Sequence, residues 1–79
     1  NAIFQNSYDG WDQAMATIYT LCQDKLTGSA KDVLETKQQQ WLDMREQAAL
    51  DTPIFLVTDM TKMRTYDLIS FYFDDHFYD

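Results

Sequence analysis

Apolar residues recur every three or four positions along most of this chain, a spacing typical of helices that bury one face. The first predicted helix spans about residues 7–26, with Ser7 or Asp9 as its N-cap. Its apolar stripe consists of Trp11, Met15, Ile18, Tyr19, Cys22 and Leu26. Gly28 then interrupts the pattern, because glycine readily ends a helix in the left-handed conformation.

The second predicted helix spans about residues 30–50 and has an unusual inward face. That face reads Leu34, Gln38, Trp41, Arg45 and Ala48, so polar or charged side chains interrupt the apolar ones. Pro53 suits the first turn of a third helix, which we expect to run to about Phe77. Residues 54–57 also fit a short strand, but a strand without a partner is less plausible than a buried helical turn.

The scarcity of turn residues supports an all-α fold. The chain of 79 residues contains two glycines and one proline, whereas an all-β domain needs a turn signal roughly every 8–12 residues. The sequence is 46% hydrophobic and 15% aromatic, which favours a folded core over disorder. We expect one domain over residues 1–79, a small three-helix bundle in which a helical hairpin packs against a third helix.

The formal charge of −7 disfavours some classes of binding partner and favours others. Nucleic acid and anionic membrane surfaces would repel such a surface, whereas a basic protein would be attracted to it. The charge is also explained by solubility alone. No apolar run approaches the roughly 18 residues that a membrane-spanning helix needs. Because the sequence begins at Asn1 rather than Met, the lack of a visible signal peptide is uninformative.

No residue pattern indicates catalysis or a cofactor. Cys22 is the only cysteine, so no intrachain disulfide can form, and its place on the apolar stripe predicts a buried side chain. A single His and a single Cys cannot build the usual Cys–His zinc site. Asp74, Asp75, His76 and Asp79 form a weak candidate metal cluster, but such a run is more often a solvated tail. We therefore expect neither an enzyme nor a cofactor or metal.

Gln38, Trp41 and Arg45 lie three and four residues apart and share one helix face. An arginine on a packed face needs an acceptor or an aromatic surface, and Asp12 on the first helix is the candidate partner. We interpret these residues as a polar network that fixes helix register, in preference to a ligand-contacting site. Arg64 on the third helix is interpreted in the same way.

The C-terminal end is aromatic on every side. One helix buries only one face, so its aromatic residues cannot all lie in the core of a monomer. Some of them either close the bundle or form a contact patch for a partner or a second copy. The candidate partner-binding residues are Tyr72, Phe73, Phe77 and Tyr78.

Together these positions resemble the LprI-type domain, a family of bacterial secreted proteins and lipoproteins. The second helix carries the strongest similarity, through Leu34, Gln38, Trp41 and Arg45, and the match runs in register from about Asp12 to Leu68. The residues that carry the resemblance, and that look like a structural framework, are Asp12, Tyr19, Leu34, Gln38, Trp41, Arg45, Thr61, Arg64 and Leu68. Family members often have cysteines flanking these helices, where this chain has Ala48 and Ala49.

The resemblance implies a helical fold and an extracytoplasmic location, whether secreted, periplasmic or lipid-anchored. It also implies binding and inhibition of a lysozyme, by occlusion of the active-site cleft. An acidic inhibitor would be steered to a basic lysozyme by long-range attraction. The alternative is a structural or assembly module of the cell envelope, homodimeric through the aromatic end, without inhibitor activity.

Overall fold

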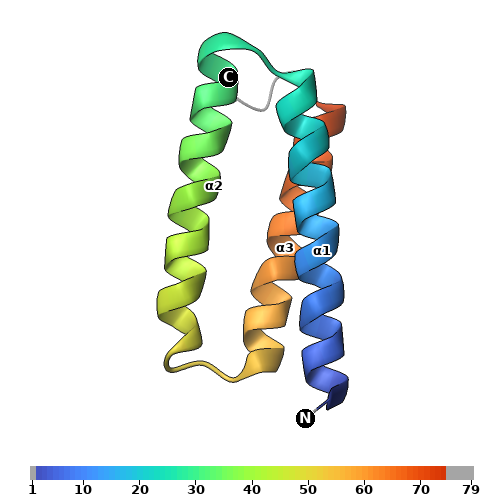
Figure 1. Ribbon diagram of the computed structural model, residues 1–79, viewed down its shortest axis with the longest axis vertical. Coiled ribbons are helices and arrows are strands. Elements are labelled where there is room, and N and C mark those ends of the chain that lie inside the picture. Colours follow the sequence, from blue (N-terminus) through green and yellow to red (C-terminus); the bar gives the residue numbers. More distant parts are fainter. Residues whose placement is uncertain (1, 75–79) are drawn as a thin grey trace.

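The computed structural model describes residues 2–74, which form three α-helices without a strand. Helix α1 spans Ala2–Lys25, α2 spans Gly28–Ala49 and α3 spans Ile54–Phe73. The chain runs up, down and up again, so that α1 and α3 are parallel and α2 is antiparallel to both (Figure 1). The predicted three-helix, all-α bundle is confirmed. None of the helices, over the described residues, is long and apolar enough to cross a membrane.

Several predicted helix ends were wrong. Helix α1 begins at Ala2, so Ser7 and Asp9 lie inside it and are not N-caps. The ring of Phe4, in the unpredicted first turn, lies 6.2 Å from that of Phe55 on α3, and this contact anchors a turn that local capping signals could not reveal. Helix α3 ends at Phe73 instead of Phe77, and residues 75–79 lie outside the described residues.

The connections use the residues that the pattern singled out. Gly28 has a φ of +60°, the left-handed conformation that glycine adopts without strain. Thr27 is the N-cap of α2, but its side chain makes no capping hydrogen bond. Pro53 precedes α3, and residues 54–57 form the first turn of that helix, so the strand alternative is excluded.

The core lies between the faces predicted for α1 and α2 and a face of α3 that carries Val57, Thr61 and Leu68. Its buried apolar members are Met15, Ile18 and Cys22 of α1, Leu34 of α2, and Val57 and Leu68 of α3. Tyr19, Leu26, Trp41 and Phe71 pack around this cluster while partly exposed. The apolar stripe predicted for the first helix therefore faces the core.

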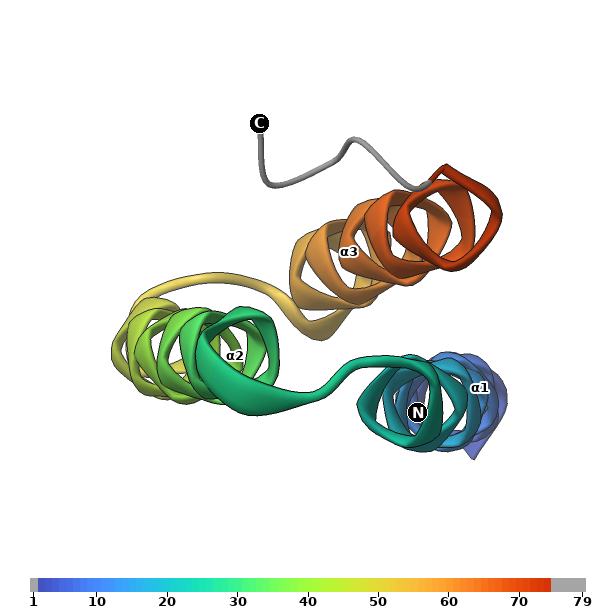
Figure 2. The same ribbon diagram turned by 90° about the horizontal axis from the view of Figure 1, so that it is seen from above.

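Helices α1 and α3 form the most extensive interface, whereas α2 stands further from both (Figures 1 and 2). The buried face of α3 explains the close approach, because it carries the short side chains of Thr58, Thr61 and Thr65. Each hydroxyl donates to the carbonyl oxygen four residues earlier, at 2.8, 2.9 and 2.7 Å respectively. The threonines are therefore buried without an unpaired hydroxyl hydrogen.

Candidate protein-binding site

Arg45 ties α2 to both other helices. Its guanidinium Nη1 donates to Asp12 Oδ1 on α1 at 2.7 Å and to Thr61 Oγ1 on α3 at 3.3 Å. Its Cζ lies 5.2 Å from the ring centre of Trp41 and 5.3 Å from that of Tyr8. The predicted pairing of Arg45 with Asp12 is confirmed, and the aromatic faces supply the other contacts that a largely buried guanidinium needs.

Arg64 makes a second cross-helix bond. Its Nε donates to Gln38 Oε1 at 2.9 Å, and only 3% of Gln38 is exposed. The guanidinium carbon also lies 5.8 Å from the ring centre of Phe71 on its own helix. A buried amide without a partner would destabilise the fold, so this hydrogen bond stabilises the packing of α2 against α3. We call these two arginines with Asp12, Gln38 and Thr61 the polar framework.

The remaining residues of the family pattern are structural in position. Leu34 and Leu68 are fully buried, and Tyr19 is half-buried at the edge of the core. The pKa of Tyr19 is raised, mainly by burial and further by the negative charge of Glu35. The positive charge of Arg64 lowers it in part. Cys22 is buried too, and its Sγ donates to the carbonyl oxygen of Leu68 at 3.4 Å. Burial raises the pKa of this thiol, against the opposing charges of Lys25 and Arg64.

The aromatic C-terminal end is only partly described. Tyr72 is half-buried, with the ammonium of Lys25 lying 5.2 Å from its ring centre. The same ammonium donates to the carbonyl oxygen of Tyr72. Phe73 packs edge-on against Tyr72 at 5.1 Å and remains 78% exposed. Phe77 and Tyr78 lie outside the described residues, so a partner-binding role for this end stays a prediction.

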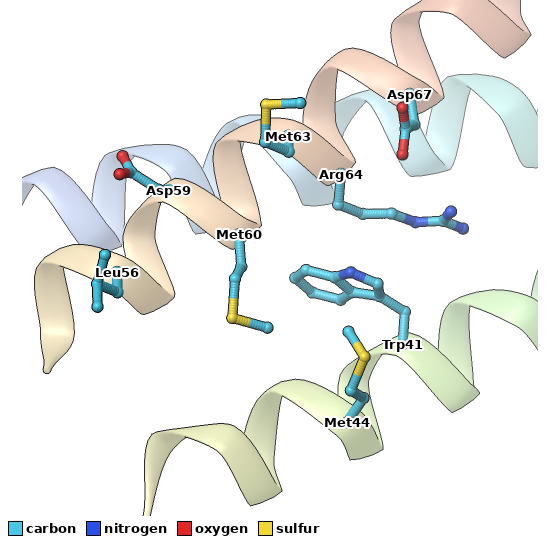
Figure 3. Close-up of a pocket in the computed structure, with 8 residues that line it drawn as sticks. All are labelled: Trp41, Met44, Leu56, Asp59, Met60, Met63, Arg64 and Asp67. Carbon is cyan, nitrogen blue, oxygen red and sulfur yellow. The ribbon is translucent and has the colours of Figure 1, made fainter. Parts of the chain in front are cut away.

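An open and mainly apolar groove of about 470 Å³ lies between α2 and α3 (Figure 3). Trp41 and Met44 line it from α2. Helix α3 contributes Leu56, Asp59, Met60, Met63, Arg64 and Asp67. We call these eight residues the methionine groove. Met60 and Met63 fall within the third predicted helix, but the sequence pattern did not predict the groove. The available signal was Met44, which lies three residues from Trp41 and so shares its face.

Within residues 2–74, no cluster of three or more His, Cys, Asp or Glu side chains is placed to hold a metal ion. Of the candidate cluster at the C-terminus, Asp74 is described, whereas Asp75, His76 and Asp79 lie outside the described residues.

The fold and the polar framework define a small all-α bundle whose helices are joined by arginine-centred bonds. A family model, described as lysozyme inhibitor LprI, matches residues 1–68. The chain therefore belongs to the LprI lysozyme-inhibitor family, as its resemblance in sequence implied. Comparison with curated proteins and with solved structures found no match. The matched region contains the whole polar framework and the whole methionine groove, whereas Tyr72 and Phe73 lie beyond it.

Proposed function

We propose that this chain is an extracytoplasmic protein that binds a lysozyme or a related muramidase and inhibits it by covering its active-site cleft. The observation that carries the proposal is membership of the LprI family over residues 1–68. Occlusion requires no catalytic group in the inhibitor, and it suits a small bundle whose polar interior is occupied in joining its own helices.

The charge of the chain supports the same partner. A formal charge of −7 attracts a basic protein over distances set by the salt concentration. The screening length falls from about 30 Å at 0.01 M ionic strength to about 8 Å at 0.15 M. Association with a basic lysozyme should therefore weaken as salt is added, whereas binding through apolar contacts alone would change little.

The test is the hydrolysis of bacterial cell walls by a c-type lysozyme, titrated with this protein at about 0.01 M and about 0.15 M salt. We expect stoichiometric inhibition that is weaker at the higher salt concentration. A matched control uses a small soluble substrate, because full occlusion blocks its hydrolysis as well, while an inhibitor that merely coats the cell wall does not. Absence of inhibition at large molar excess would contradict the proposal.

A second candidate function is a homodimeric module of the cell envelope, whose two copies would contact each other through a different surface. Helix α1 begins, α2 ends and α3 begins at the lower end of the molecule in Figure 1, and each of these helix ends carries an exposed apolar residue. There Ile3 is 76% exposed, Leu50 75% and Phe55 49%. An exposed apolar patch of this kind is typical of a contact surface. Light scattering tests this candidate, because a monomer at millimolar concentration would exclude it.

A further inference from the structure

The methionine groove concentrates one residue type on one surface. Three of the four methionines in the chain line it, and the fourth, Met15, is buried in the core. Met44, on α2, is 49% exposed, and Met63, on α3, is 61% exposed (Figure 3). Methionine is flexible and polarisable, and proteins use it on surfaces that adapt to the side chains of a partner.

The exposed charges in the groove are negative. Asp59 and Asp67 lie on α3 one turn before and one turn after Met63, so all three side chains share a stripe. Both carboxylates are exposed, and neither forms an ion pair within residues 2–74. The positive charge of Arg64 is held at the inner side by Gln38 and the ring of Phe71. A ligand in the groove therefore meets apolar side chains first and carboxylates at the rim.

The dimensions suit a segment of protein. From Leu56 to Asp67 the α3 side of the groove runs eleven residues, or about 16 Å at about 1.5 Å per residue. A volume of about 470 Å³ lies within the roughly 300–1,000 Å³ of typical binding clefts. This is room for a few large side chains from about three helical turns of a partner.

We propose that the methionine groove is the surface on which the partner docks, and that the partner inserts apolar side chains flanked by lysine or arginine. The argument for this occupant is charge complementarity: apolar anchors fill the groove between α2 and α3, and cations at their flanks meet Asp59 and Asp67. Where the partner is a lysozyme, the inference rests on the proposed function and adds to it the face of the inhibitor that binds.

The test uses the whole protein with its methionine methyl groups labelled with ¹³C. The spectrum then contains reporters at Met44, Met60 and Met63 in the groove, and Met15 in the core serves as an internal control. Unlabelled c-type lysozyme is added to saturation. We expect the three groove signals to shift while that of Met15 stays in place. Binding that leaves the groove signals unchanged would overturn the groove inference and leave the proposed function standing.

A pair of matched variants measures the energetic importance of the surface. Met44→Lys combined with Met63→Lys places two cations in the groove, whereas Leu21→Lys combined with Val33→Lys makes the same charge change at apolar positions outside it. Leu21 is 43% exposed and Val33 is 39% exposed. We expect the groove variant to raise the Kd at least about tenfold more than the control variant. Equal effects would show that only total charge matters and would overturn the groove inference. Circular dichroism of both variants verifies their helical fold.

A second probe separates failure of the groove from failure of the proposed function. It is a synthetic helical peptide of about twelve residues, with leucines on one face and lysines beside them, compared with a scrambled peptide of the same composition. If lysozyme does not bind but the ordered peptide shifts the groove signals more than the scrambled one, the groove inference stands and the proposed function fails. If neither lysozyme nor the ordered peptide binds, both are overturned. Groove signals that shift with protein concentration alone would identify a second copy as the occupant and overturn the inferred partner.

Discussion

The bond between Arg45 and Asp12 offers the sharpest test of how the bundle is held together. The Arg45 side chain is 13% exposed and that of Asp12 is 44% exposed, with 2.7 Å between Nη1 and Oδ1. Within residues 2–74, removing the carboxylate by Asp12→Ala leaves a largely buried guanidinium whose remaining polar contact is Thr61, with two aromatic rings beside it. The loss in the free energy of unfolding therefore depends on how poorly the remaining contacts of Arg45 compensate its buried charge.

The magnitude lies between two known limits. Breaking a fully buried ion pair costs about 3–5 kcal/mol, and a fully exposed pair contributes about 0–1 kcal/mol. Because Asp12 is nearly half exposed and Arg45 is not, we expect a loss of about 2 kcal/mol in the free energy of unfolding. For a chain of this size that corresponds to a decrease in Tm of about 8–16 °C. Replacing Arg45 by Met as well removes the unpaired charge and should recover about 1 kcal/mol.

Urea denaturation followed by circular dichroism and tryptophan fluorescence measures these changes. The matched control is Asp9→Ala, one turn earlier on α1, where the exposed carboxylate only accepts a hydrogen bond from Gln5 at 3.0 Å. Both substitutions gain the same helix propensity, so their difference reports the loss of the Arg45 bond. If Asp12→Ala and Asp9→Ala agree within about 0.5 kcal/mol, the pair is only a surface contact and the reasoning fails.

Three further substitutions test the connection between α1 and α2, the interior of α1 and the buried thiol. Gly28→Ala should destabilise the fold by about 1–2 kcal/mol, because its φ of +60° is strained for alanine. Gly10→Ala lies within α1, where an added Cβ meets no neighbouring group within 4 Å, and should instead stabilise the fold by about 0.5–1 kcal/mol. Changes in Tm of the same sign for the two glycine variants would contradict this contrast. Because burial raises the pKa of Cys22 above its ordinary 9.0, the native state keeps a proton that the unfolded chain has lost. Stability should therefore be complete below about pH 9 and fall as the pH rises further, by at most about 1.4 kcal/mol per pH unit from this group. Unfolding free energies between about pH 8 and pH 10.5 should fall less steeply for Cys22→Ala, and parallel curves would refute the linkage.

The three helices and the inward faces of α1 and α2 were predictable because each of these follows a rule of spacing. Leu34 and Gln38 differ in polarity, yet both fall on the stripe that the period of α2 requires, and both are buried. The pairing of Arg45 with Asp12 followed from the same reasoning, since a charge on a packed face needs an opposite one nearby. Spacing and the charge of Arg45 together thus identified the pair that joins α2 to α1.

Other features depend on contacts between helices and leave no local signal. The buried threonine face of α3 reads as polar in the sequence, and its burial is possible because each hydroxyl bonds to its own helix. The first turn of α1 depends on Phe4 meeting Phe55, more than fifty residues later in the chain. The methionine groove likewise needs Met44 and Met63 on facing helices, and no pattern within one helix places them together.

The polar framework and the methionine groove have a common physical cause. Helix α3 approaches α1 closely because threonines form its buried face, whereas long side chains, among them Gln38 and Arg45, stand between α2 and the other helices. The same long side chains keep the backbone of α2 away from α3, and the groove opens along that separation beside Trp41. Short apolar residues at these positions would allow α2 to close on α3 and the groove to narrow. The residues that hold the helices together thereby also determine the width of the surface on which we expect a partner to dock.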